Sequence, residues 1–444
     1  MNKHYLLLSA LSLLLWSGCS HKSTQEPQHL NASKEIVDLE FFPQLTRTYA
    51  SNIQEHKELL KSQEGYDAKY FEAWSYKKPP FKVRSIMWPF RSYTADKSYG
   101  ENLKKLPQAW FNEMLKKSNF EAYGSLNKRA MTLHYTDVRN FPTHKPVLKD
   151  PTVAGEGYPF DYMQNSGVHA NEPLFVSHLS GDGEWAYIFT TYITGWVRLR
   201  DIVYINDSVA DKYKKAKFIS MIDEQYPIKD TQNNFVFKSR VGMRLPLISI
   251  EKEHYIALSI TDGKDHTPTY TKVIIPLHVA QAETLKLTKD NLVHISDLML
   301  MSKYGWGGLY EERDCSSTLR DLYAPFGIWL PRNSSQQAKI GKVISLKDLT
   351  LEQKREKIIK EAVPFETLLY KRGHILLYLG LYKGKIAVLH NAWGIRTVNN
   401  GKEGRRILGK TIISSLALGK ELKDYDEDKG LLSKISSMNI VTQE

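Results

Sequence analysis

The spacing of apolar residues changes along the chain and divides it into regions of different predicted structure. Between Leu106 and Lys117, Pro107 stands in the first turn of a predicted helix, and the apolar positions share one side of it: Trp110, Phe111, Met114 and Leu115. We therefore expect residues 35–150 to form a mainly helical N-terminal domain.

From about residue 151 the pattern changes to short apolar runs separated by turn residues, which is typical of small β-barrels. Two sets of runs follow each other, at 173–178, 184–189 and 194–197 and then at 235–237, 245–250 and 255–260. These runs predict two small barrels, the first within residues 151–212 and the second within 213–285.

Residues 286–444 mix both periodicities and predict an α+β domain. Helical spacing occurs at 288–302 and 351–362, strands are expected at 373–380 and 386–390 around a Lys383-Gly384 turn, and residues 405–418 would close the sheet. Between them, Tyr304 to Gln337 begins with three glycines, which suit a backbone of positive φ or close approach. The whole chain is therefore predicted to be a multidomain α+β protein.

The N-terminus has the pattern of a targeting segment. Lys3 and His4 precede an apolar run from Tyr5 to Trp16, which is too short to span a bilayer as a stable helix. The run ends at Cys19, as in a lipoprotein signal, although Trp16 is unusual there. Residues 1–18 would then be removed and Cys19 diacylated, with ordinary signal-peptidase cleavage as the alternative, and residues 19–34 would be a polar tether.

A lipid on Cys19 would place the protein at the cell envelope, on the periplasmic side of a bacterial membrane. Ser20 follows the cysteine in place of aspartate, which favours the outer membrane. The formal net charge of +12 suits anionic envelope polymers or lipid head groups, and a solvated basic surface is the plain alternative. We find no nucleic-acid motif, no metal-ligand set and no cofactor motif, and we expect a monomer.

The chain has two cysteines, and acylation of Cys19 would leave Cys315 as its free thiol. Cys315 precedes Ser316 and Ser317, which suit a helix N-cap, so it is expected at the first turn of a helix. The N-terminal end of a helix stabilises a thiolate, which is how a reactive cysteine is made. A buried cysteine that acts only as a small apolar residue is the alternative.

A nucleophilic cysteine needs a base, and two histidines lie on the predicted hairpin downstream. His374 could take the proton of Cys315, and His390 could hold the imidazole of His374 in the required tautomer. The register of the hairpin does not follow from the sequence, so whether both histidines face Cys315 is an assumption.

Five blocks in order, YGWGG, DCSS, LPRNSSQQ, GHILLYLG and VLHNAWG, resemble the NlpC-type cysteine peptidases of bacterial cell walls. The resemblance implies a papain-like α+β catalytic domain with Cys315 as nucleophile, His374 as base and His390 as the third polar residue. It also implies that the Cys315 backbone N–H donates to the oxyanion. Residues expected at the oxyanion and substrate-binding site are Tyr304, Asp314 and Ser316.

The upstream regions carry weaker resemblances. The TGWV segment at 194–197 is a recurrent feature of bacterial SH3-like domains, so both barrels resemble that fold. The helical region resembles the domain that precedes such barrels in a subgroup of these peptidases. Residues 158–165 also resemble a stretch of that subgroup, and Asp161 or a neighbouring tyrosine could complete the substrate pocket; shaping a turn is the alternative.

The substrate that the resemblance implies is a peptidoglycan stem peptide, cut between γ-D-glutamate and a diamino acid. Relatives with SH3-like domains hold a free L-alanine amine with an acidic residue after LPR, where this chain has Asn333 followed by Ser334. An amide offers no charge to an ammonium, so selection of the amine is expected to be weaker or supplied elsewhere.

Two other functions fit the same sequence. The chain could be a catalytically inactive lipoprotein that binds peptidoglycan, although the presence of Cys315, His374 and His390 together argues against that reading. It could also be an acyltransferase or amidase built on the same fold, which would be recognised by its products.

Overall fold

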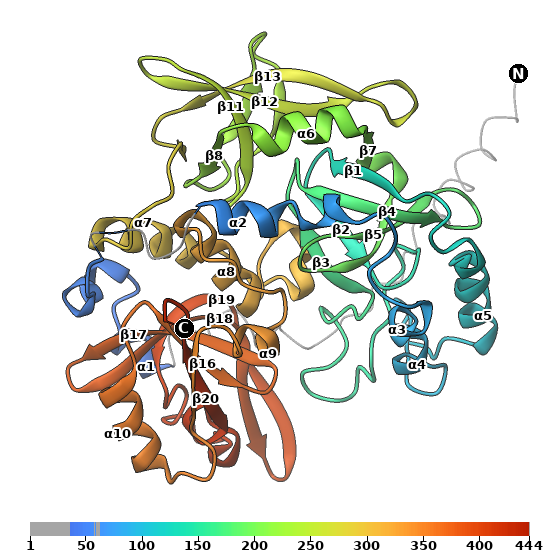
Figure 1. The fold of residues 1–444 in the computed structure, drawn as a ribbon. Helices are drawn as coiled ribbons and strands as arrows, with labels where there is room; N and C mark the ends of the chain where they lie inside the picture. Colours follow the sequence, from blue (N-terminus) through green and yellow to red (C-terminus); the bar gives the residue numbers. More distant parts are fainter. Residues whose placement is uncertain (1–35, 57, 59–62, 444) are drawn as a thin grey trace, which may run out of the picture.

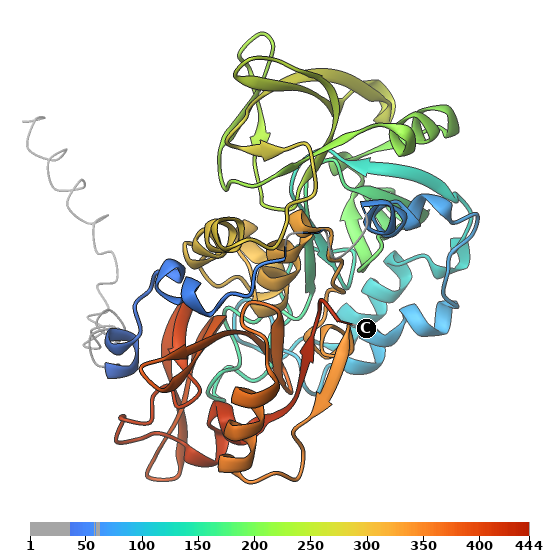
Figure 2. The same ribbon diagram turned by 60° about the vertical axis from the view of Figure 1, so that its left-hand side comes forward.

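The computed structural model describes residues 36–56, 58 and 63–443. The predicted leader, Cys19 and the tether lie outside these residues. Three antiparallel sheets form three bodies, with the second barrel at the top of Figures 1 and 2, the first barrel in the middle and the C-terminal domain at the bottom. In the described part of the chain, we find no helix that combines the length and apolar character needed to cross a membrane.

The N-terminal region is helical, and its parts pack on different bodies. The first turns pack on the C-terminal domain, where Thr46 Oγ1 donates to Asp297 Oδ1 (2.6 Å) and Asn52 Nδ2 donates to the Leu379 carbonyl (3.0 Å). The later helices lie beside the first barrel (Figure 1). The helices are α1 (Val37–Phe41), α2 (Gln63–Tyr70), α3 (Val83–Ile86), α4 (Trp88–Ser92) and α5 (Gln108–Lys117).

The first barrel is a seven-stranded sheet in the order β3-β2-β6-β5-β4-β1-β7. It begins at Lys128, before the expected start at residue 151, because β1 and β2 pair with strands that follow a long loop, a tertiary contact that local spacing does not encode. Its strands are β1 (Lys128–Thr132), β2 (Thr136–Arg139), β3 (Gln164–Val168), β4 (Pro173–Leu179), β5 (Trp185–Phe189), β6 (Thr194–Arg198) and β7 (Ile202–Ile205).

Helix α6 (Asp207–Lys215), capped by Asn206, leads into the second barrel, whose strand order is β10-β9-β13-β12-β11-β8-β14. Most of its buried residues form one core, and a further cluster joins Phe218 and Ile260 of this barrel to Met131 and Val203 of the first barrel. Its strands are β8 (Phe218–Met221), β9 (Pro227–Asp230), β10 (Phe235–Lys238), β11 (Arg244–Ile250), β12 (His254–Asp262), β13 (Pro268–Pro276) and β14 (Ala280–Gln281).

The C-terminal domain packs α7 and α8 against a six-stranded sheet, in the order β15-β20-β16-β17-β18-β19. Its helices are α7 (Lys289–Leu300), α8 (Cys315–Tyr323), α9 (Ser334–Gln337), α10 (Leu351–Glu361) and α11 (Leu431–Lys434). Its strands are β15 (Lys342–Ser345), β16 (Thr367–Lys371), β17 (His374–Tyr382), β18 (Lys385–Asn399), β19 (Lys402–Ser415) and β20 (Ile435–Ile440). The predicted α+β class, with two barrels before it, is confirmed.

Candidate active site

Cys315 is the first residue of α8, as the helical spacing after it predicts, but the expected N-cap at Ser316 or Ser317 is wrong, because the helix begins one residue before them. Asp314 is the N-cap: its carboxylate accepts from the Ser317 backbone N–H (2.9 Å), and Ser317 Oγ accepts from the Asp314 N–H (2.9 Å). The reciprocal bonds fix the first turn of the helix. The thiol is partly buried and accepts a backbone hydrogen bond from Ile375, the residue after His374.

The two histidines lie on neighbouring strands and share one face of the hairpin. Leu377 pairs with Leu389, so His374 and His390 both project to the face opposite that pair. His374 Nε2 lies 2.8 Å from His390 Nδ1, and His390 Nε2 lies 3.0 Å from Ser414 Oγ on β19. The register that the sequence left open therefore brings both rings together.

This chain of hydrogen bonds assigns the tautomers. Ser414 Oγ donates its proton to the Ser415 carbonyl (3.0 Å), so it accepts from the Nε2–H of His390. His390 Nδ1 then has no proton and accepts from the Nε2–H of His374. His374 Nδ1 is left with a lone pair, which is the group that a general base needs.

Burial keeps both reacting groups neutral in the free protein. Burial, with the Asp314 charge adding to it, raises the pKa of the Cys315 thiol to about 12, against the opposing backbone hydrogen bonds and Arg332. Burial, then His390 and Lys371, holds the pKa of His374 well below its usual range, and burial lowers that of His390 to about 3. The resting pair is a thiol and an imidazole, which differs from the thiolate that a helix N-terminus alone predicts.

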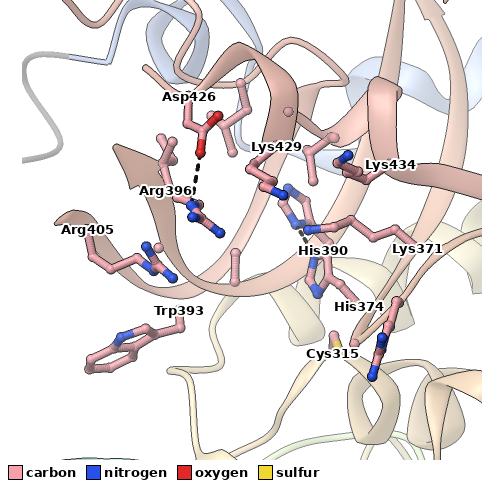
Figure 3. A pocket seen from close by; sticks show the side chains of 18 of the residues that line it. Cys315, Lys371, His374, His390, Trp393, Arg396, Arg405, Asp426, Lys429 and Lys434 are labelled. Atoms are coloured by element: carbon pink, nitrogen blue, oxygen red, sulfur yellow. Dashed lines mark hydrogen bonds and ion pairs between the residues drawn. The ribbon is translucent and has the colours of Figure 1, made fainter. Parts of the chain in front are cut away.

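Cys315, His374 and His390 line a cavity of about 700 Å³ (Figure 3). Tyr304 also lines it, as expected, and packs against Trp393 with ring centroids 5.6 Å apart. Burial holds the pKa of its phenol well above the usual range. The wall continues across the domain border, where Phe160 from the loop before β3 packs edge-on against Trp306 (5.1 Å) and Trp393 (5.6 Å).

The cavity is strongly basic, a feature that the sequence reasoning missed. The KRGH sequence that ends in His374 was the available signal, because the strand placed there puts Lys371 and Arg372 beside the histidine. The remaining cations come from distant segments. The cationic lining residues are Lys371, Arg372, Arg396, Arg405, Lys429 and Lys434.

Asp314 and Ser316, expected in the substrate site, face away from the cavity. The Asp314 carboxylate is held by Arg332 Nη2 (2.6 Å), and Ser316 Oγ accepts from Arg332 Nη1 (2.9 Å). Arg332 is buried and also donates to Ser166 Oγ of β3 (2.8 Å). Both residues therefore support the first turn of α8 and its junction with the first barrel.

Three other expected substrate residues also lie outside the cavity lining. Asp161 is buried with Arg139 (2.7 Å) and accepts from the Val147 and Met163 N–H groups, so its charge is already paired. Asn333 is exposed at the start of α9, and Ser334 is the first residue of that short helix. Phe160, the neighbour of Asp161, is the residue of that stretch that reaches the cavity. Within the described ranges, no cluster of three or more potential metal ligands occurs.

Four family models match successive parts of the chain. The model of the NLPC_P60 stabilising domain (N term) matches residues 7–123, SH3 domains of SH3b1 and SH3b2 type match 146–198 and 206–251, and the NlpC/P60 family model matches 301–410. Residues 301–410 form an NlpC/P60 domain. This domain contains Cys315, His374 and His390. The match of the family model confirms the resemblance drawn from the five blocks.

One solved structure shares the fold over most of the chain. An NlpC/P60 endopeptidase from Photobacterium damselae subsp. piscicida is 23% identical, with 90% of this chain and 98% of that chain covered at a TM-score of 0.78. An NlpC/P60 family protein from Bacillus cereus ATCC 10987 is 13% identical over 71% of this chain and 99% of that one, at a TM-score of 0.45. No curated protein matches the sequence. The NlpC/P60 domain supports a cysteine peptidase of the peptidoglycan-hydrolase type, and the SH3b domains support binding to peptidoglycan.

Proposed function

We propose that the chain is an endopeptidase that cuts the bond between γ-D-glutamate and a diamino acid in peptidoglycan stem peptides. The observation that carries the proposal is the connected site: Cys315 at the N-terminus of α8 and the free Nδ1 of His374, fixed through His390, face one cavity. A nucleophile, a base and a group that orients the base are the requirements for acyl transfer through a covalent intermediate.

In the proposed reaction, His374 Nδ1 takes the thiol proton as Cys315 Sγ attacks the carbonyl carbon of the γ-D-glutamyl group. The backbone N–H of Cys315, unpaired at the helix N-terminus, donates to the developing oxyanion. The C–N bond then breaks, and His374 gives its proton to the leaving amine. Water, deprotonated by His374, hydrolyses the thioester and returns the free thiol.

The lining of the cavity bears on how the acyl half is recognised. Among the described residues, one acidic side chain lines the cavity, that of Asp426, and it is already paired with Arg396 (2.9 Å). A free N-terminal ammonium would therefore find no open carboxylate there, and Asn333 lies outside the lining. We propose that this enzyme depends little on a free L-alanine amine.

We also propose that a lipid on Cys19 holds it on the periplasmic side of a bacterial membrane, with the outer membrane favoured.

The test is mass spectrometry of L-Ala-γ-D-Glu-diaminopimelate and its N-acetyl form after incubation with the protein. We expect cleavage after D-glutamate in both, at rates within about tenfold, because no charge-assisted bond to the amine is lost. Cys315→Ala should remove cleavage and keep the melting temperature. A folded wild-type protein that binds peptidoglycan but cuts neither peptide would favour the inactive binding lipoprotein.

A further inference from the structure

Strand β19 lies at one end of the six-stranded sheet, and the start of the chain holds its outer edge. The edge of a sheet leaves backbone groups without a strand partner. Gln44 takes the place of a partner at Ile413: its Oε1 accepts from the Ile413 N–H (2.8 Å) and its Nε2 donates to the Ile413 carbonyl (2.7 Å). Asp38 accepts from the Ser415 N–H (2.8 Å) and from Ser415 Oγ (2.7 Å). The two side chains therefore fix β19 on both sides of Ser414.

Ser414 is buried between these two contacts and reaches the histidines of the site. It pairs with Val388, two residues before His390, so its side chain projects to the same face of the sheet as that ring. Its Oγ donates to the Ser415 carbonyl (3.0 Å) and lies 3.0 Å from His390 Nε2. In the described part of the chain, Ser414 is not among the residues that line the cavity. Its hydroxyl therefore contacts the imidazole that orients the base and does not contact the substrate.

The direction of the Ser414 hydroxyl decides which nitrogen of His374 is free. A serine hydroxyl can donate or accept, and both histidines are neutral, so each ring carries one proton. While the hydroxyl donates to the Ser415 carbonyl, it accepts from the Nε2–H of His390, and His374 keeps its Nδ1 free. If the hydroxyl turned to His390, both rings would change tautomer and His374 would carry its proton on Nδ1. In that form His374 cannot take the proton of Cys315.

We propose that Ser414 is a positioning residue of this site, because its hydroxyl fixes the tautomer of His390. Gln44 and Asp38 belong to the same arrangement, since they hold the strand that carries Ser414. The inference rests on the proposed function and extends the site to residues that do not line the cavity. Hydrogen bonds weaken steeply when their distance and angle change, so a shift of β19 loosens the contact that sets the tautomer. The N-terminal segment, residues 36–52, therefore acts on the reaction as well as on stability.

The first test removes the hydroxyl. For the wild type and Ser414→Ala, kcat and KM are measured on L-Ala-γ-D-Glu-diaminopimelate, and nitrogen NMR of the imidazole rings shows which nitrogen of each ring is protonated. We expect kcat to fall about tenfold, because a hydrogen bond that favours the required tautomer is lost. KM should stay within about twofold, since Ser414 does not contact the substrate. His390 should carry its proton on Nε2 in the wild type and show both tautomers in the variant. Ser414→Thr, which keeps a hydroxyl, should restore most of kcat.

Ser259→Ala is the matched control for this substitution. Ser259 is also a buried serine on a strand, and its Oγ donates to the carbonyl of the next residue, Ile260 (3.4 Å). It belongs to β12 of the second barrel, outside the catalytic domain. Its replacement removes a comparable hydrogen bond and should keep the wild-type kcat and the wild-type tautomers.

The second test concerns the N-terminal segment. Gln44→Ala removes both bonds to Ile413, and we expect kcat to fall about threefold at an unchanged KM, with the second tautomer of the rings becoming visible. Asn52→Ala is its control. It removes two bonds from the same segment to the Leu379 and Leu381 carbonyls of β17, and it should keep kcat and the tautomers.

A folded Ser414→Ala with the wild-type kcat and one tautomer of His390 would overturn the inference. If that variant does not fold, Gln44→Ala decides, and an unchanged kcat with unchanged tautomers would overturn it. A wild type whose His390 carries its proton on Nδ1 overturns it whatever the activity. A wild type that cuts no peptide would overturn the proposed function, and the tautomers of the variants would still show whether Ser414 fixes His374.

Discussion

The reacting groups of this site are prepared by burial and by neighbouring charges. The Asp314 carboxylate adds to burial in raising the pKa of the Cys315 thiol, and Lys371 adds to burial and His390 in lowering the pKa of His374. The two shifts have opposite directions, and together they favour the neutral pair over the thiolate–imidazolium pair. Proton transfer is therefore expected to wait for substrate, when the oxyanion donors can stabilise the charge that the attack creates.

The first prediction concerns alkylation of Cys315 by iodoacetamide, followed by mass spectrometry of the cysteine peptide. Below a thiol's pKa the thiolate fraction grows about tenfold per pH unit, so the raised pKa predicts a rate that still rises steeply from pH 7 to above 9. Free cysteine, with a pKa near 8.5, is the reference and should level off earlier. A rate that is constant between pH 6 and 9 would indicate a preformed thiolate and contradict this account.

At the scale of the element, the N-terminus of α8 serves both stability and reactivity. Asp314 caps the helix and holds the buried guanidinium of Arg332, which in turn reaches β3 of the first barrel. Burial raises the pKa of Asp314, but Arg332 and the cap hydrogen bonds outweigh it, so the carboxylate stays charged. The Asp314 carboxylate, whose charge raises the pKa of the Cys315 thiol, is therefore also needed for the cap of α8 and for the pair with Arg332.

Replacing Asp314 should therefore lower stability and raise thiol reactivity together. Asp314→Ala removes the cap and leaves Arg332 buried without its partner, so we expect the free energy of unfolding to fall by about 3–5 kcal/mol. Asp314→Asn keeps an acceptor and should cost less. Both variants should alkylate faster at pH 8, because the pKa of Cys315 falls when the negative charge is removed. Chemical denaturation and alkylation rates check the two parts.

The control is Thr350→Ala, which removes the cap of the exposed helix α10 and should cost about 1 kcal/mol with no change at Cys315. Loss of stability in Asp314→Ala no greater than in this control would show that the Arg332 pair contributes little.

At the scale of the whole molecule, both barrels are fastened to the catalytic domain near the active site. A Cβ on Gly307 would lie 2.7 Å from the Gln164 carbonyl oxygen of β3, so the YGWGG loop needs glycine to lie against the first barrel. Arg313 at the end of this loop bonds Glu224 of the second barrel (2.6 Å) and Asp321 of α8 (2.7 Å). His169 of the first barrel reaches the same Asp321 (3.4 Å).

Arg313→Met tests this junction. It leaves the buried Asp321 and the largely buried carboxylate of Glu224 with one cation fewer. We expect the free energy of unfolding to fall by about 3 kcal/mol in urea denaturation. Arg47→Met is the control, because it breaks an exposed ion pair: the side chains of Arg47 and Asp290 are 63% and 85% accessible. It should lower the free energy of unfolding by less than about 1 kcal/mol. Equal effects of the two substitutions would show that the junction does not stabilise the molecule.

The sequence by itself determined the elements and the chemistry of the nucleophile. Helical spacing after Cys315, alternation around Lys383-Gly384 and the short runs of the barrels depend on local periodicity. Helix α8, the β17–β18 hairpin and the six predicted barrel runs lie where these patterns placed them, whereas the other eight barrel strands were not predicted. The five ordered blocks also gave the family of the C-terminal domain. Local preference is sufficient for such features, because each depends on neighbours within one helix or hairpin.

Only the tertiary structure decided what surrounds those residues. The strand register brought His374 and His390 together, and packing turned Asp161 and Asp314 toward Arg139 and Arg332 and away from the cavity. Segments far apart in the chain supplied the rest of the cavity lining. Phe160 and Trp393 form part of its wall, and Lys371, Lys429 and Lys434 are among its cationic residues. Charge pairing and burial depend on these distant contacts, so the neutral thiol and the basic cavity could not be derived from local sequence.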